Sequence, residues 1–563
     1  MRTHVCMLLE GTYPYVRGGV SSWVHQVITG LPELRFALVF IGSRRADYGE
    51  QRYVLPSNVV KLEQHYLEDA FSASEPRKLS AQPRRFANVR GFHEQLAVAA
   101  GRRQCPISGL GALRAQSEAL LSELGAEGGL SLDEFLYSPC SWEQMRVAYL
   151  ERDQRAAFVD YFWTLRFMHG PLFQLARIAR TVAEAGAYHA VSTGYAGFLG
   201  MLLQRRRRRP LILSEHGIYT KERRIDLNQA DWFEHLHEGA AEAGSSAGLR
   251  ELWISYFESL GRLTYSAADP IISLYAGNRE RQLRDGARPE RTRIIVNGID
   301  AARFAAARKQ RSAEVPKVVG LIGRVVPIKD VKTFIRALQH VCAAIPDVQG
   351  WIIGSSEEDP SYGAECEALV HSLGLAGRVR FLGHQDVREI LPQLGLLMLT
   401  SISEAQPLAI LEAFAAGVPC VATDVGACRE EIEGSSAADR ALGLAGRVVP
   451  FADARALADA AIELLSNLQS WRACQRAVLA RVERLEQHLL PRPVRDVTRG
   501  RRRRQLLAVD ERHARRRARG ADGHQALPGR AGYDPEPEGG DRQGGRRREL
   551  HPPPGRDARP GWR

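Results

Sequence analysis

The sequence has little of what marks secreted, membrane-spanning or metal-binding proteins. Its eight cysteines are scattered, with no Cys-x-x-Cys pair, so we expect reduced thiols and a cytoplasmic location. No apolar run approaches the roughly 20 residues of a membrane helix, and the first such run is too short for the core of a signal peptide. An Asp-x-Asp motif is missing as well. We expect a soluble protein that needs no metal and no other cofactor.

Positive charge is concentrated at one end of the chain. Of the net charge of +12, residues 491–563 contribute +10, from 20 arginines, 10 acidic residues and no lysine. The remaining body is nearly neutral, which does not favour binding of nucleic acid. The arginine-rich end has no apolar periodicity and follows helix-breaking prolines at Pro491 and Pro493, so residues 486–563 are expected to be a disordered tail. This tail is either native or an out-of-frame reading of GC-rich DNA.

Apolar runs and amphipathic segments alternate along the chain, which predicts an α/β protein with two parallel, Rossmann-like sheets. Residues 1–300 and 301–485 are expected to form two domains that face each other across a cleft, with a helical insertion at about 67–180. The strands expected in the first domain are 5–9, 36–41, 188–192, 211–214, 271–274 and 293–296. Those expected in the second domain are 318–322, 350–353, 379–382, 396–400, 420–422 and 447–449.

Two glutamates stand eight positions apart after the expected strand 396–400. Glu404 falls in the loop at the carboxyl end of this strand, where open α/β sheets bind their ligands. Good helix formers follow, which predicts that Glu412 lies about two turns into a helix. This spacing suits the two ends of an extended, hydroxyl-rich ligand better than a single reaction centre.

Cations and glycines stand at two other strand ends. Arg324 and Lys329 follow the strand 318–322 and precede a helix, an arrangement that suits a diphosphate. Gly18 and Gly19 open a helix after the first strand, where a backbone without side chains can approach a phosphate closely.

As a set, these motifs resemble the family 4 retaining glycosyltransferases of the GT-B fold, from about residue 1 to residue 485. Three segments are also similar in amino-acid sequence to the glycosyltransferases of Pel exopolysaccharide synthesis. The segments that carry this closer resemblance are Glu10-Gly11-Thr12-Tyr13-Pro14-Tyr15, Glu215-His216-Gly217-Ile218-Tyr219-Thr220-Lys221-Glu222 and Ser401-Ile402-Ser403-Glu404-Ala405-Gln406-Pro407.

The resemblance implies catalytic roles for Arg324, Lys329, Glu404 and His216. The two cations would stabilise the negative charge that grows on the diphosphate of a UDP-sugar during transfer. Glu404 would hold the hydroxyls of the transferred sugar. His216 corresponds to a strand-end histidine of the family, and its alternative is a hydrogen-bonded core histidine.

Binding roles follow from the same resemblance. Glu412 would bind the ribose hydroxyls, while the loop at Gly18 and Gly19 would bind the diphosphate from the first domain. The segment from Gln406 onward would complete the donor cradle with backbone amides. Pro407 stands where many family members have glycine, so Leu408 and Ala409 must supply those amides. Tyr195 and His169 are candidates for the acceptor side, and His169 also suits a core position.

The expected activity is retaining, metal-independent transfer of a hexose from a UDP-sugar, UDP-glucose favoured, onto a growing polysaccharide. Expected partners are the acceptor and inner-membrane Pel synthase subunits, which would recruit the protein to the membrane face. A GT-B sugar-nucleotide epimerase and a catalytically idle nucleotide-binding scaffold are the alternatives.

Overall fold

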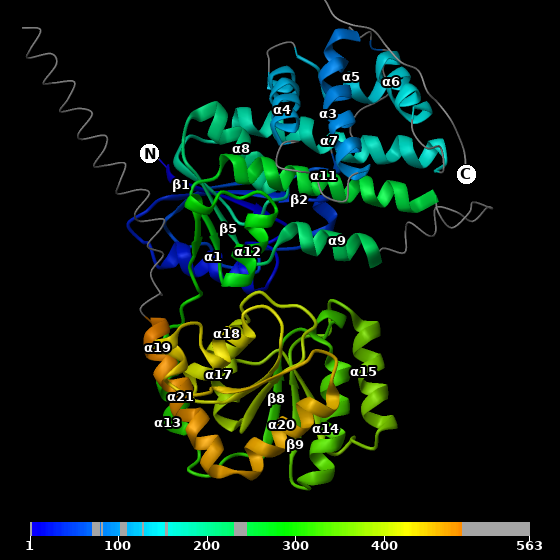
Figure 1. Cartoon of the computed structure of the whole chain (residues 1–563). Coiled ribbons are helices and arrows are strands. Elements are labelled where there is room, and N and C mark those ends of the chain that lie inside the picture. The colour runs from blue at the N-terminus through cyan, green and yellow to red at the C-terminus, as the bar shows by residue number, and fades with distance from the viewer. Residues whose placement is uncertain are drawn as a thin grey trace, which may run out of the picture. The chain divides into compact units, whose positions relative to one another are not determined.

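The computed structural model describes residues 3–69, 79, 83–101, 110–125, 129–151, 156–229 and 245–486. These residues form two parallel sheets, the first before residue 300 and the second after it (Figure 1). Helices cover the faces of each sheet, so the expected pair of Rossmann-like folds is confirmed. The predicted tail lies outside the described residues from position 487 onward.

The first sheet has the strand order β3-β2-β1-β4-β5-β6-β7. β1 lies inside it, and its side chains alternate between two cores: Cys6 and Leu8 face one, while Val5, Met7 and Leu9 face the other. This double burial explains why β1 reads as a continuous apolar run. The strands are β1 (Thr3–Glu10), β2 (Phe36–Gly42), β3 (Val59–Tyr66), β4 (Ala185–Ala190), β5 (Leu211–Glu215), β6 (Ile271–Ser273) and β7 (Thr292–Ile294).

The sequence interpretation omitted β3 and displaced β4. β3 is an edge strand that pairs with β2, and polar residues such as Lys61 and Glu63 interrupt its apolar pattern. An edge strand is covered incompletely, so it carries no continuous apolar run. β4 ends at Ala190 rather than at Ser192, because its ladder with β1, which starts at the pair Thr3–Ala185, ends at Ala190.

The second sheet has the order β10-β9-β8-β11-β12-β13, and each of these strands was predicted to within one residue at either end. Ladders join β8 to both β9 and β11, so its carboxyl end lies beside that of β11. The strands are β8 (Val318–Ile322), β9 (Gln349–Ile353), β10 (Val379–Gly383), β11 (Leu396–Leu399), β12 (Cys420–Thr423) and β13 (Gly446–Val449).

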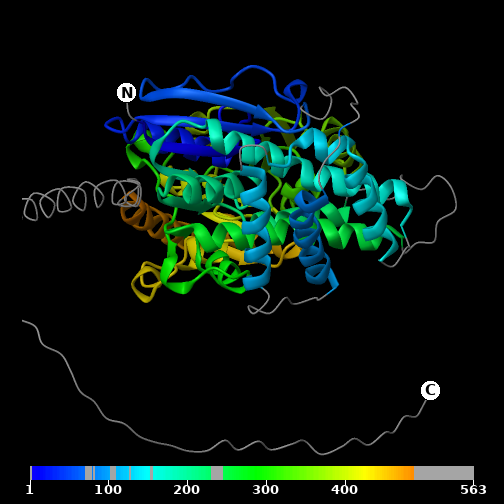
Figure 2. The ribbon, with the colours of Figure 1, turned by 90° about the horizontal axis from the view of Figure 1, so that it is seen from above.

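The helices of the first half fall into two groups. Those that connect its strands are α1 (Gly19–Thr29), α8 (Tyr195–Arg207), α9 (Tyr219–Gln229), α11 (Ser245–Ala267) and α12 (Ala276–Arg284). The expected helical insertion consists of α3 (Pro83–Gly101), α4 (Leu110–Gly125), α5 (Leu132–Tyr137), α6 (Pro139–Leu150) and α7 (Phe158–Thr181). Figures 1 and 2 show the insertion helices side by side, and α3 and α7 pack against α11 and α8.

Most helices of the second half lie between its strands, and α20 and α21 follow the last strand. They are α13 (Ala305–Gln310), α14 (Val331–Ala344), α15 (Pro360–Ser372), α16 (Val387–Ile390), α17 (Leu408–Ala415), α18 (Cys428–Glu433), α19 (Ala437–Arg440), α20 (Ala454–Ser466) and α21 (Leu468–Glu486). No helix in the described ranges is both long and apolar enough to cross a membrane.

Candidate active site

Lys329 and Glu404 meet at the carboxyl edge of the second sheet. Lys329 closes a short 3₁₀ turn after β8, and Glu404 follows β11, the neighbouring strand. The Lys329 Nζ forms an ion pair with Glu404 Oε1, which also accepts a 2.6 Å hydrogen bond from the hydroxyl of Ser401. Thr400 Oγ1 donates to the carbonyl of Lys329 at 2.8 Å and fixes the turn. Two predicted catalytic residues are thus brought into contact by adjacent strands.

Arg324 stands apart from this pair. Its guanidinium is paired with Glu358, and about half of its side chain is exposed. The loop that carries it is held by the backbone, since Val325 N–H donates to Ser355 at 2.9 Å. A ligand anion would have to compete with Glu358 for Arg324, whereas Lys329 still has two further N–H donors beside Glu404.

The helix formers that follow Pro407 form α17, as predicted, but Glu412 lies less deep in this helix than predicted. Pro407 is its N-cap and Leu408 its first residue, so Glu412 lies about one turn into the helix and not two. The correction has a physical cause: Ala405 and Gln406 form a bend and Pro407 is extended, so no helical turn precedes Leu408. Leu408 and Ala409 occupy the first two helical positions, as a donor cradle requires.

Gln406 forms a hydrogen bond through its side chain, whereas the sequence analysis predicted a role for its backbone. The Oε1 atom of Gln406 accepts a 2.6 Å hydrogen bond from the backbone N–H of Asn297. Asn297 belongs to the segment that connects the two sheets, so this bond joins the connection to the approach of α17. The side-chain Oδ1 of Asn297 is buried and has no hydrogen-bond partner among the described residues.

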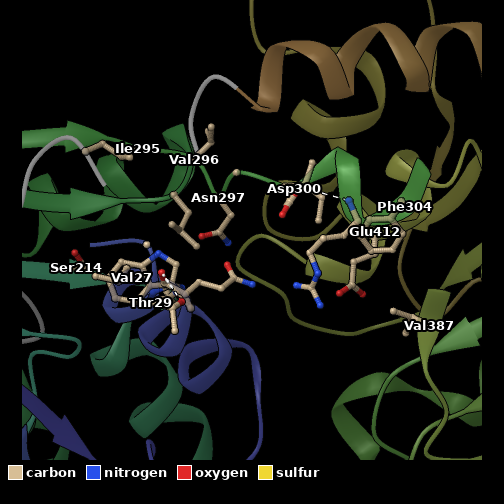
Figure 3. A pocket seen from close by; sticks show the side chains of 18 of the residues that line it. Val27, Thr29, Ser214, Ile295, Val296, Asn297, Asp300, Phe304, Val387 and Glu412 are labelled. Carbon is tan, nitrogen blue, oxygen red and sulfur yellow. Dashed lines mark hydrogen bonds between the residues drawn. The ribbon is translucent and has the colours of Figure 1, made fainter. Parts of the chain in front are cut away.

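A pocket of about 820 Å³ lies beside Asn297. Its walls come from α1, from the ends of β4, β5 and β6, from the connection 295–300 and from the loop after β10. Figure 3 shows Glu412, Phe304 and Asp300 on one side of the space, and Val27, Thr29 and Ser214 on the other. Its volume falls in the range of sites for small molecules.

Glu412 is the acidic group on one side of this pocket. Burial raises its pKa from the ordinary value of 4.5 to about 7, and the positive charge of Arg303 opposes the shift. Arg303, His384 and Asp386 line the same side. A carboxyl group with a pKa near 7 is found at functional sites more often than elsewhere.

Two neutral histidines form the opposite wall. Burial lowers the pKa of His216 to about 4 and, together with the nearby His216, lowers that of His189 to about 3. His189 Nε2 is hydrogen bonded to Ser214 at 2.8 Å, while the Nε2 atom of His216 has no partner among the described residues. The ring of Trp23 packs edge-to-face against both, with centroids 4.6 Å from His216 and 5.8 Å from His189. These imidazoles can offer hydrogen bonds without charge.

Of the predicted site residues, His216 and Glu412 line this pocket. The others lie outside its lining: Arg324, Lys329, Glu404, Gln406, Leu408, Ala409, Gly18, Gly19, Tyr195 and His169. Gly18 is the N-cap of α1 and Gly19 its first residue, and a Cβ added to either would meet no atom within 4 Å. Local packing therefore does not require glycine here, whereas the approach of a ligand would. Tyr195 begins α8 and packs against Phe257 with ring centroids 6.0 Å apart. His169 is buried in α7 and lines a separate cavity of the insertion.

Sequence reasoning missed Trp23, His189 and Arg303. Trp23, Gln26, Val27 and Gly30 all line the pocket, so α1 presents positions with helical spacing to it. That pattern can be read from the sequence, but it is equally typical of a core face. Which face meets a ligand depends on packing between distant elements.

Residues 3–290, more than half of the chain, match the model of a family described as a domain of unknown function, DUF3492. The chain belongs to the DUF3492 family. Residues 316–467, which hold all six strands of the second sheet, match the family model for group 1 glycosyl transferases. In this DUF3492 protein, residues 316–467 therefore form a group 1 glycosyltransferase domain.

Curated relatives agree with this assignment. The lipopolysaccharide core biosynthesis mannosyltransferase LpsB of Rhizobium meliloti is 30% identical over 34% of this chain and 55% of its own length. The D-inositol 3-phosphate glycosyltransferase of Salinispora tropica is 28% identical over 46% of this chain and 55% of its own length. The chain thus spans about half the length of these relatives.

A solved structure supports the fold across nearly the whole chain. The sucrose-phosphate synthase of Thermosynechococcus elongatus superposes with a TM-score of 0.50 at 17% identity, and covers 90% of this chain and all of its own. This likeness shows the GT-B fold, which was the expected fold class.

Proposed function

We propose that this protein transfers a hexose from a UDP-sugar, with UDP-glucose favoured, onto a growing exopolysaccharide of the Pel type, as its resemblance to the glycosyltransferase PelF implies. The observation that carries the proposal is the contact between Lys329 and Glu404 at two adjacent strand ends. A cation beside a carboxylate matches a ligand that has an anionic leaving group next to a hydroxyl-bearing sugar.

The proposed reaction is driven by charge stabilisation. As the bond to the anomeric carbon breaks, negative charge grows on the leaving phosphate, and fixed donors in a water-poor site stabilise it strongly. Lys329 can donate to that phosphate and keep its bond to Glu404, because an ammonium group has three N–H donors. The amides at Gly18 and Gly19 would bind the same diphosphate. Arg324 would contribute once the diphosphate displaces Glu358.

We propose that transfer occurs on the same face of the sugar with retention and without a metal. In this reaction the oxygen of the acceptor hydroxyl bonds to the anomeric carbon as the bond to the phosphate oxygen breaks. The leaving phosphate takes the hydroxyl proton. Glu404 holds the sugar hydroxyls, Glu412 holds the ribose, and His216, which stays neutral, acts as a hydrogen-bonding group beside the transferred sugar.

The proposed acceptor side includes Tyr195 and the wall around Trp23, while His169 lies in a different cavity and is a weaker candidate for contact. Inner-membrane synthase subunits are the proposed partners, and through them the protein would work at the cytoplasmic face of the membrane. The alternatives remain an epimerase and a scaffold that binds nucleotide without catalysis.

Two measurements test the proposal. A melting-temperature panel with UDP-, ADP- and GDP-sugars identifies the donor, because a ligand that binds only the folded state stabilises it by mass action. Stabilisation by ADP- or GDP-sugars in place of UDP-sugars would overturn the donor assignment. Release of UDP that depends on an added polysaccharide acceptor separates a transferase from the alternatives: an epimerase interconverts UDP-sugars without acceptor, and a scaffold releases no UDP. Chelator should not change the rate.

A further inference from the structure

A second pocket lies in the helical insertion and shares no lining residue with the first. It has a volume of about 250 Å³ and is bounded by α3, α5, α6 and α7. Its walls are largely apolar, with Val89, Phe135, Met145, Ala148 and Leu165 among them. For scale, an engineered apolar cavity of roughly 150 Å³ is large enough to bind benzene. The space here is sufficient for a molecule of about two fused rings.

His169 is the most deeply buried of three buried polar residues in this wall, the others being His93 and Ser141. Only 2% of the residue is exposed, and its ring lies 5.9 Å from that of Phe135. Its Nδ1 is 3.0 Å from the carbonyl oxygen of Leu165, which can only accept, so Nδ1 carries the hydrogen. Burial lowers the pKa of His169 to about 4, and the ring is neutral at physiological pH. The Nε2 atom therefore holds a lone pair, and it has no partner among the described residues.

The opening of the pocket is charged. Arg90 Nε donates to Glu94 at 2.7 Å, and Arg90 Nη2 donates to Glu151 at 3.4 Å, which links α3 to the end of α6. All three side chains are about half exposed and line the pocket. A rim of two carboxylates around one cation repels an anionic ligand and is open to water.

We propose that this pocket binds a small uncharged aromatic molecule of about two fused rings, which donates an O–H or N–H hydrogen bond to Nε2 of His169. Such a ligand satisfies a buried acceptor that is costly to leave unpaired. Its rings replace empty space against Phe135 and Met145. A water molecule is a poorer occupant, because it needs two to four polar partners, and the buried polar groups beside His169 already have their own: His93 bonds to Tyr161, and the Ser141 hydroxyl donates to the carbonyl of Phe135.

The direct test uses two probes that differ only in the donor. Indole has an N–H group, and 1-methylindole presents a methyl group in its place. Calorimetry with the full chain should show that indole binds roughly three- to ten-fold more tightly, the range expected for one net hydrogen bond. In His169→Phe the ring volume is kept and the acceptor is lost, so this preference should disappear. No donor sugar or acceptor is present, so the result is independent of the proposed transferase activity.

A second variant protects the test against misfolding of the first. Ala148→Phe fills the pocket from α6 and should abolish binding of both probes. Its matched control is Ala364→Phe, at an exposed position of α15, which should bind indole as the unchanged protein does. Equal affinity for the two probes, binding that survives Ala148→Phe, or no binding of indole to the unchanged protein would each overturn the proposal.

Discussion

Lys329 and Glu404 form an ion pair across two neighbouring strand ends, with side chains only 20% and 12% exposed. The pair is poor evidence for stability, since the cost of desolvating two charges can exceed their attraction. We propose instead that the pair is a preorganised site, in which Lys329 would bind a phosphate and Glu404 would bind hydroxyl groups.

Removal of the cation should therefore reduce turnover strongly. Lys329→Ala is expected to lower kcat by on the order of 10²–10³, as the loss of a fixed donor to a developing negative charge does. Arg324→Ala should have a smaller effect than Lys329→Ala, since Arg324 is exposed and held by Glu358. The matched control is Lys317→Ala, which breaks an exposed pair with Asp347 and should leave the rate unchanged. Near-full turnover of Lys329→Ala at saturating UDP-sugar would refute the role of Lys329 as a donor to the diphosphate.

Substitutions of Glu404 and of Glu412 should have different effects on the binding of UDP. Glu412→Ala is expected to weaken binding of UDP itself, because its carboxylate would accept hydrogen bonds from the ribose. Glu404→Ala should leave UDP binding nearly intact and reduce discrimination among UDP-hexoses. Calorimetry with UDP alone distinguishes the two variants. Equal losses of affinity would contradict this division of roles.

The raised pKa of Glu412 predicts a pH dependence with a definite sign. The folded protein holds this proton up to about pH 7, whereas the unfolded chain releases it near 4.5, so stability falls as pH rises between these values. Binding of UDP should instead strengthen as pH rises through about 7, because the ionised group accepts both ribose hydroxyls. Glu412→Gln should flatten this dependence and raise the melting temperature of the free protein at pH 8. The same pH slope of UDP affinity in both proteins would assign the effect elsewhere.

Trp23 should matter through the imidazole it touches. Trp23→Ala removes an edge-to-face contact with His216, and such contacts contribute about 0.5–1.5 kcal/mol. We expect activity to fall up to about ten-fold, with partial recovery in Trp23→Phe. Trp142→Ala, a half-exposed tryptophan of α6, is the control and should keep full activity. If both alanine variants behave alike, Trp23 is not part of the site.

The sequence alone predicted the second sheet more completely than the first. Its four inner strands, β9, β8, β11 and β12, are short and mostly buried on both faces, so each appears as an isolated apolar run between turn signals. β3 was missed because an edge strand such as Val59–Tyr66 can carry polar residues on both faces. The depth of Glu412 in α17 was overestimated, because the eight positions from Glu404 include a bend and the extended Pro407, which are not helical.

The residues of the candidate site also differ in how well the sequence predicts them. Residues close together in the sequence, such as Glu404, Gln406 and Glu412, were predicted from their spacing and from the family resemblance. The structure brings Lys329 into contact with Glu404 because β8 and β11 are neighbours. Trp23 and His189 are separated by more than 160 positions and meet only through packing of α1 on the first sheet. No local pattern encodes that meeting.

The hydrogen bond between Asn297 and Gln406 has a consequence for recombination between related proteins. Asn297 lies in the connection that precedes the second domain, yet its backbone N–H donates to the side chain of a residue more than one hundred positions later. The donor is a backbone N–H, which every residue except proline has, whereas the acceptor needs the side chain of a glutamine. A chimera that takes its second domain from a homologue should therefore keep this bond only where the homologue also has glutamine at the position of Gln406, whichever residue other than proline stands at 297.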